Sequence, residues 1–95
     1  MTNTDIARKL REHAAELARE GGNLYRVRAF RQAAFAVLGL PREVKDVVAA
    51  AGPDALRAVP GIGDSLAGTI SDFAVRGEWN PRTPVREPRR LAKAG

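Results

Sequence analysis

The chain has 95 residues, a net charge of +5, no cysteine and a single histidine. This composition excludes a disulfide framework, thiolate chemistry and a zinc site made of histidine and cysteine, and no apolar run approaches the length of a membrane span. We therefore expect one small cytoplasmic domain that makes no contact with a membrane.

The positive charge is concentrated in two segments. Residues 21–40 contain Arg26, Arg28 and Arg31 and no acidic residue, and residues 78–95 contain five basic and two acidic residues. Each segment therefore carries a charge of +3, and the rest of the chain carries −1. Such a distribution suits a polyanionic partner, but on charge alone a solvated basic surface is an equal alternative.

Apolar residues recur every three to four positions in the first half of the chain, as in amphipathic helices. The first predicted helix spans about 4–20 and is broken by Gly21-Gly22. The second begins after Asn23 as N-cap and ends at Gly39. The predicted core residues of these two helices are Ile6, Leu10, Ala14, Leu17, Val27, Phe30, Ala34, Val37 and Leu38.

The second half predicts shorter helices. Pro41 is expected in the first turn of a third helix, which Gly52-Pro53 ends. A short helical turn and a bend, Pro60-Gly61-Ile62-Gly63, lead into a last helix over about 64–76 with Gly77 as its C-cap. The residues expected to be buried are Val44, Val47, Val48, Leu56, Val59, Leu66, Ile70 and Phe73.

No convincing alternation typical of a strand is present. We therefore predict an all-α, compact domain of four to five helices over residues 1–79, followed by a basic, proline-rich, flexible tail over residues 80–95. Trp79 is expected to fold back and anchor on the last helix.

The bend lies in the stretch "AVPGIGDSLAGTI", residues 58–70. Glycines permit positive φ or a close approach of the backbone, and Ile62 between them can point down between the flanking helices. The backbone N–H groups of Gly61, Gly63, Asp64 and Ser65 then lie open at a helix start, where unpaired donors and the helix dipole favour an anion. The pattern predicts a phosphate-binding hairpin; a plain helix–helix turn is the alternative.

Other glycine-rich phosphate loops do not fit. A dinucleotide fingerprint needs a preceding strand and a third glycine, and Leu66 stands where that glycine would be. A P-loop needs Gly-Lys-Ser or Gly-Lys-Thr, which the bend lacks.

The bend resembles a helix-hairpin-helix motif, and the resemblance extends further. "NLYRVRAFRQAAFAVLGLPREV" followed by "LRAVPGIGDSLAGTISDFAVRGEW" is similar to the N-terminal domain of family X DNA polymerases, the DNA polymerase beta type. The resemblance implies a DNA repair role, binding of gapped or single-stranded DNA near a 5′ phosphate, and a place with the nucleoid. It also implies a monovalent cation, Na⁺ or K⁺, on the main-chain carbonyls of Arg57, Val59 and Ile62.

The sequence departs from that family at the residues that carry its chemistry. The family's Schiff-base lysine matches Thr69, and a supporting lysine matches Ser65; neither side chain can condense with an aldehyde. We therefore expect no catalytic residue, no required cofactor and a non-enzymatic monomer that acts beside a separate polymerase or nuclease chain. The alternatives are a divergent abasic-site lyase that uses Lys9, Lys45 or the terminal amine, and a protein-interaction module.

The remaining polar and aromatic residues divide between binding and structure. Arg26, Arg28 and Arg31 are predicted to lie along DNA phosphates, because no acidic residue lies among them. Tyr25 and Phe35 are predicted to be structural, with Phe35 packed on the first helix, and stacking on a base is the alternative. The side chains of Asp64 and Ser65 are expected to cap the last helix, and His13 is expected to be packed or solvated rather than catalytic.

Overall fold

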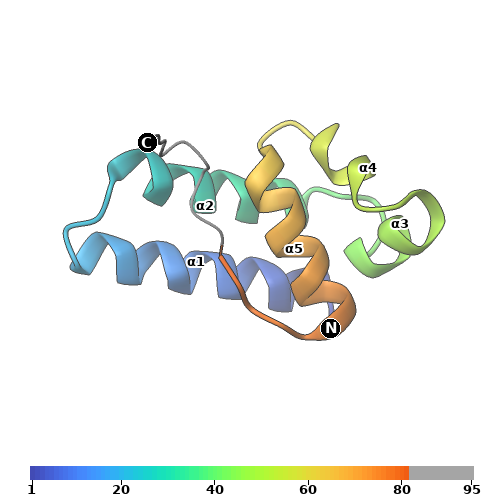
Figure 1. Cartoon of the computed structure of the whole chain (residues 1–95), viewed down its shortest axis with the longest axis horizontal. Helices are drawn as coiled ribbons and strands as arrows, with labels where there is room; N and C mark the ends of the chain where they lie inside the picture. Colours follow the sequence, from blue (N-terminus) through green and yellow to red (C-terminus); the bar gives the residue numbers. More distant parts are fainter. Residues whose placement is uncertain (82–95) are drawn as a thin grey trace, which may run out of the picture.

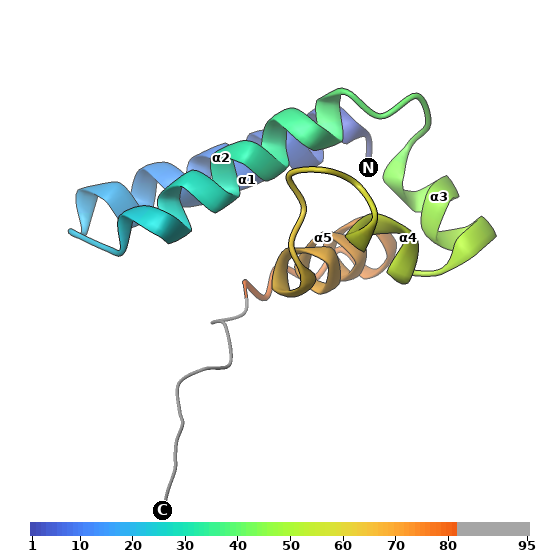
Figure 2. The same ribbon diagram turned by 90° about the horizontal axis from the view of Figure 1, so that it is seen from above.

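The computed structural model describes residues 1–81, and all their regular structure is helical. The helices are α1 (Asn3–Arg19), α2 (Leu24–Leu38), α3 (Val44–Ala51), α4 (Asp54–Arg57) and α5 (Asp64–Arg76). Helices α1 and α2 form a long antiparallel pair, α5 packs on them, and α3 and α4 lie at one end (Figures 1 and 2). The predicted all-α class is confirmed, and residues 82–95 of the predicted tail lie outside the described residues.

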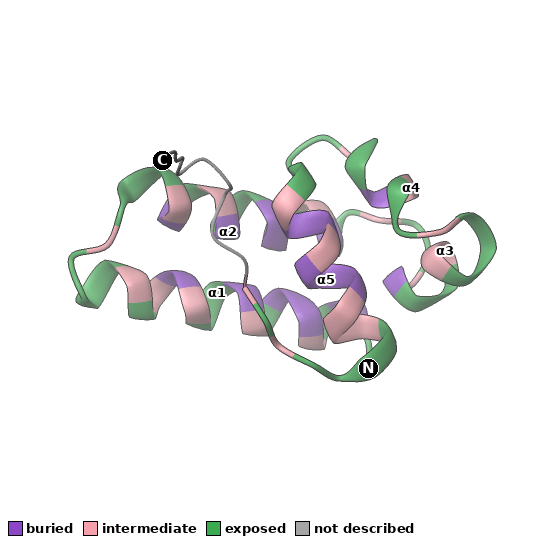
Figure 3. Cartoon of the chain, in the orientation of Figure 1, coloured by how far each residue is buried: buried purple, intermediate pink, exposed green. Residues whose placement is uncertain are grey.

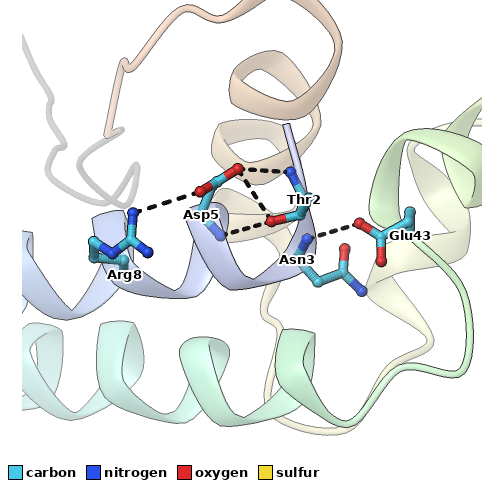
Figure 4. Close-up of polar contacts among 5 residues, drawn as sticks. All are labelled: Thr2, Asn3, Asp5, Arg8 and Glu43. Carbon is cyan, nitrogen blue, oxygen red and sulfur yellow. Dashed lines mark hydrogen bonds and ion pairs between the residues drawn. The ribbon is translucent and has the colours of Figure 1, made fainter.

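Helix α1 begins with a reciprocal cap, shown in Figure 4. The Asp5 amide donates to Thr2 Oγ1 at 3.2 Å, and the Thr2 amide donates to Asp5 Oδ2 at 2.9 Å. The Thr2 hydroxyl also donates to Asp5 Oδ2, at 3.0 Å. The hydrogen bonds from the Thr2 amide and hydroxyl to this carboxylate lower the pKa of Asp5. The helix ends at Arg19, and Gly21 with a φ of +73° begins the turn to α2, so the predicted glycine break is confirmed.

The core lies where α1, α2 and α5 meet (Figure 3). Ile62, at the tip of the bend, is only 4 % exposed, so its predicted position between the helices is confirmed. Five residues expected in the core are half-buried and pack against it instead: Leu17, Val47, Val48, Val59 and Phe73. The buried apolar residues are Ile6, Ala7, Leu10, Ala14, Val27, Phe30, Ala33, Ala34, Val37, Val44, Leu56, Ile62, Leu66, Ala67 and Ile70.

A buried asparagine, Asn3, joins the start of α1 to the segment that begins α3. Asn3 Oδ1 accepts from the Val44 amide at 2.8 Å, and its Nδ2 donates to the Arg42 carbonyl at 2.9 Å. The Asn3 amide donates to Glu43 Oε1 at 2.9 Å (Figure 4). These bonds place the first turn of α3 at Val44, so the prediction that Pro41 lies in that turn is wrong.

The segment after α5 is anchored by Trp79, as predicted. The Trp79 ring centroid lies 5.3 Å from that of Phe73 and 5.6 Å from that of His13, and Lys9 Nζ lies 5.5 Å from it. Gly77, with a φ of +72°, ends α5 and turns the chain back toward α1. Trp79 therefore ties residues 78–81 to α1 and α5.

Three residues of α2 that were expected to be structural or buried lie outside the core. Tyr25 is 82 % exposed, Phe35 is 76 % exposed and Leu38 is 45 % exposed. The prediction that Tyr25 and Phe35 are structural and that Leu38 belongs to the core is therefore wrong. The reason is geometric: α1 and α5 cover the side of α2 that carries Phe30 and Val37, and these three side chains project from its remaining surface. No helix within residues 1–81 has the length and apolarity to cross a membrane.

Candidate nucleic-acid interface

The two glycines of the bend have different structural roles. Gly61 has a φ of +95°, and a Cβ atom there would lie 3.3 Å from Ala36 Cβ and 3.3 Å from the Gln32 carbonyl oxygen. Gly61 therefore allows the bend to pack closely on α2. Gly63 has a φ of −84°, and a Cβ atom there would meet nothing within 4 Å. The packing of the bend on α2 therefore requires glycine at position 61, whereas a side chain at position 63 would meet only open space.

The backbone amides after this bend are available to a ligand. Gly63 is the N-cap of α5, and no side chain caps the helix, so the expectation that Asp64 and Ser65 do so is wrong. In the described part of the chain, the first backbone amide at this helix start that donates to a carbonyl is that of Ala67, which bonds to Gly63 O at 2.8 Å. The preceding donors, at the positive end of the helix dipole, can hold an anion.

These amides border a groove between the bend and the first half of α2. The groove has a volume of about 470 Å³. Figure 2 shows the loop before α5 lying beside α2, which brings the two walls together. The lining residues are Tyr25, Arg26, Ala29, Phe30 and Gln32 from α2, and Gly61, Ile62, Gly63, Ser65 and Leu66 from the bend and α5.

The three arginines of α2 do not share this groove. Arg26 lines it, and its guanidinium carbon lies 5.6 Å from the Phe30 ring centroid. Arg28 and Arg31 are exposed and do not line the groove. The structure therefore brings Arg26 together with Gly61, Gly63 and Ser65, and contact of Arg28 or Arg31 with DNA stays a prediction.

An ion pair closes the bend on its α4 side. Arg57 Nε lies 3.8 Å from Asp64 Oδ1, and Arg57 Nη1 lies 3.7 Å from Asp54 Oδ1. The Asp64 carboxylate is exposed, so its charge acts beside the free amides and opposes an incoming anion. Arg57 offsets part of that charge, and solvent screens the rest.

Thr69, which was expected to stand in place of the Schiff-base lysine of family X polymerases, is inaccessible. Thr69 is fully buried, and its hydroxyl lies within donating distance of two carbonyl oxygens, those of Ser65 at 3.2 Å and Asn80 at 3.3 Å. The segment anchored by Trp79 therefore supplies a polar contact to Thr69 and helps to cover it. A side chain at this position has no access to the groove, which Thr69 does not line.

His13 is packed, which is one of the two expected outcomes. Its ring lies 4.6 Å from Phe30 and 5.6 Å from Trp79, centroid to centroid, and its side chain is 17 % exposed. Burial lowers the pKa of His13, and the nearby Glu16 carboxylate acts in the opposite direction. His13 does not line the groove, so it belongs to the structural cluster around Trp79.

The structure favours the alternative that the sequence left open for Tyr25, because this residue lines the groove with its side chain largely in solvent. Ala29 and Gln32 also line the groove, and the sequence did not single them out. The place of Tyr25 next to Arg26, at the start of an arginine-containing helix, is the signal that could have identified it.

A family model described as a helix-hairpin-helix domain matches residues 1–78. No curated protein and no solved structure matches the chain.

Proposed function

The chain belongs to the helix-hairpin-helix domain family, and we propose that it binds DNA by holding a backbone phosphate on the amides of its hairpin. Domains of this family commonly bind nucleic acid. Contact through backbone amides reads no base sequence, so the binding is not sequence-specific. The observation that carries the proposal has two parts. Within residues 1–81, the amides of Gly63, Asp64 and Ser65 donate to no backbone carbonyl, and Gly63 and Ser65 line an open groove with Arg26 on its other wall.

The groove favours the end of a strand as the ligand. A 5′ phosphate carries more negative charge than a phosphate within a strand, and Arg26 can form charge-assisted hydrogen bonds with it. Tyr25 offers an exposed ring at the same groove for an unpaired base. We therefore propose gapped or single-stranded DNA with a 5′ phosphate as the preferred ligand. We also propose a role in DNA repair beside a separate polymerase or nuclease, since such DNA ends arise during repair.

We further propose that the domain is not an enzyme. A lyase of the family X type needs an amine that reaches the sugar, and burial of Thr69 supports its absence here. Ser65, which does line the groove, has a hydroxyl and cannot form a Schiff base. Neither Lys9 nor Lys45 lines the groove. Lys9 lies over the Trp79 ring, and Lys45 lies on α3.

The monovalent cation is a separate part of the proposal. The carbonyls of Arg57, Val59 and Ile62 would hold it beside the phosphate, where its charge would support anion binding. The Val59 carbonyl accepts from the Ile62 amide at 3.1 Å and retains a second lone pair, so it fits this role. DNA affinity should then be higher in Na⁺ or K⁺ than in a bulky organic cation at equal ionic strength.

A binding titration tests the proposed function. The full chain is titrated onto gapped DNA with a 5′ phosphate, the same DNA with a 5′ hydroxyl, single strands and intact duplex, each at several salt concentrations. We expect the 5′-phosphate ligand to bind at least fivefold more tightly than the 5′-hydroxyl ligand. Each phosphate neutralised should add about −0.9 to the slope of log K against log salt on duplex DNA.

The tail is tested in the same titration. Deletion of residues 82–95 removes five basic residues and one acidic residue, so the salt slope should become shallower for all ligands alike. No measurable binding to any of the four ligands would contradict DNA binding, and equal affinity without salt dependence would contradict the phosphate contact.

A further inference from the structure

The surface of α2 that faces away from the groove carries a regular stripe of exposed residues. Its members, called here the outer stripe, are Leu24, Arg28, Arg31, Phe35 and Leu38. They are spaced four, three, four and three residues apart and run the full length of the helix. This spacing places them on one side of a helix, and it is the spacing of a coiled-coil seam.

The outer stripe is exposed over its whole length. Leu24 is 70 % exposed, Phe35 is 76 % exposed and Leu38 is 45 % exposed. Arg28 and Arg31 lie between them, and within residues 1–81 neither arginine has a carboxylate at ion-pair distance. Apolar residues at both ends of a continuous stripe, with two cations between them, are typical of a surface that another protein covers.

We propose that the outer stripe binds an amphipathic helix of a partner protein that has acidic residues at the centre of its contact face. Apolar residues of that helix would cover Leu24, Phe35 and Leu38. Its carboxylates would pair with Arg28 and Arg31. Helix α2 has 15 residues, about four turns, so the partner needs about two heptads of matching helix.

Charge favours this occupant over others within reach. A second copy in parallel register would set Arg28 and Arg31 against their own counterparts, and an antiparallel copy that pairs Leu24 with Phe35 would set Arg28 against Arg31. The segment 82–95 has five basic residues and one acidic residue, so the same arginines repel it. DNA phosphates would also pair with Arg28 and Arg31, and a base would stack on Phe35, but Leu24 and Leu38 would stay exposed to solvent. An amphipathic helix covers the leucines as well as the arginines.

A designed peptide tests the proposal. The probe is a three-heptad helical peptide with leucine at the outer seam positions and glutamate at the two central ones, and a control peptide has lysine at those two positions. Binding of labelled peptide to the full chain is measured by fluorescence anisotropy. We expect the glutamate peptide to bind at least tenfold more tightly than the lysine peptide. The double variant R28E/R31E should reverse that preference, and equal binding of the two peptides, or an unchanged preference in the variant, would overturn the proposal.

The uncharged variant Phe35→Ala distinguishes peptide binding at the outer stripe from DNA binding at the groove. Phe35→Ala should weaken binding of the glutamate peptide at least fivefold and leave affinity for gapped 5′-phosphorylated DNA within twofold of the unmodified chain. Because Phe35 is exposed, the variant should fold normally by circular dichroism. If Phe35→Ala weakens DNA binding and leaves peptide binding unchanged, the outer stripe is a nucleic-acid surface and the proposal is wrong. Failure of DNA binding in the unmodified chain would instead contradict the proposed function and leave the peptide result intact.

Discussion

The substitution Gly63→Ala separates phosphate binding from folding. Gly63 has a φ of −84° and open space where a Cβ would stand, so alanine fits without a clash. Alanine is a poorer N-cap than glycine, by up to about 1 kcal/mol. Against this, it reduces the entropy of the unfolded chain, which stabilises by about 0.4–1 kcal/mol. The two effects nearly cancel, and the free energy of unfolding should change by less than about 1 kcal/mol.

DNA affinity should respond much more strongly. The added methyl group would stand beside the amides that are proposed to hold a phosphate, so the phosphate could not approach to hydrogen-bond distance. Loss of one hydrogen bond to a charged group costs about 1.5–3 kcal/mol, which corresponds to a roughly 10- to 150-fold weaker affinity. The assay is fluorescence anisotropy on gapped, 5′-phosphorylated DNA, at a temperature where circular dichroism shows the variant to be folded.

Ile62→Ala is the matched control one residue away. Ile62 is 4 % exposed and packed in the core, so its truncation should cost about 2–5 kcal/mol of stability. It leaves the hairpin amides in place, and DNA affinity should fall only in proportion to the unfolded fraction. If folded Gly63→Ala binds DNA within twofold of the unmodified chain, the phosphate contact at the hairpin is wrong.

Four further variants test other parts of the structure. Asn3→Ala should lower the free energy of unfolding by about 1–3 kcal/mol in urea titrations, since the buried Val44 amide loses its acceptor. An unchanged free energy of unfolding would contradict the stabilisation of the start of α3 by Asn3. Burial lowers the pKa of His13 in the folded chain, so the unfolded chain takes up a proton first as the pH falls. The free energy of unfolding should therefore decline as the pH falls below about 6.5. Denaturation at several pH values should show this decline, and His13→Gln should abolish it. Asp64→Asn should raise DNA affinity two- to fivefold at low salt, because it removes a carboxylate that repels the phosphate. Two like charges 4 Å apart in water repel by about 1 kcal/mol, and salt screens this repulsion, so the gain in affinity should be smaller at high salt. Borohydride with abasic-site DNA should trap no adduct on the unmodified chain, and strong trapping would refute the non-enzymatic proposal. Thr69→Lys should lower the melting temperature, because it forces an ammonium group into a buried site.

Local signals predicted most of the helical boundaries, because glycines and apolar spacing act within a few residues. The ends of α1 and α2 and the cap at Gly77 follow from such signals. The start of α3 does not, because Asn3 determines it from the other end of the sequence. No local pattern reports a hydrogen bond between residues 41 positions apart.

The outer face of α2 shows a second limit of sequence reasoning. Large apolar residues in a small helical domain are usually part of the core, yet Phe35 and Leu38 are exposed. Their exposure depends on which sides of α2 the other helices cover, and helical periodicity alone does not specify this.

The candidate site was predictable in part. The hairpin amides follow from a contiguous stretch of sequence, so the pattern around Gly61 and Gly63 indicated them. The opposite wall, with Tyr25 and Arg26, comes from a different helix and is brought into place by the packing of Gly61 on α2. Helix geometry separates Arg26 from Arg28 and Arg31, because residues two and five positions apart lie on different sides of a helix.

The most direct test of phosphate binding at the hairpin is a two-dimensional ¹H–¹⁵N NMR titration of the full ¹⁵N-labelled chain with gapped, 5′-phosphorylated DNA. The account predicts that the backbone amide signals of Gly61, Gly63, Asp64 and Ser65 shift most, together with the Arg26 side chain. Signals of α3, at the far end of the molecule, should shift little. Shifts confined to other surfaces, with the hairpin amides unmoved at saturating DNA, would contradict it.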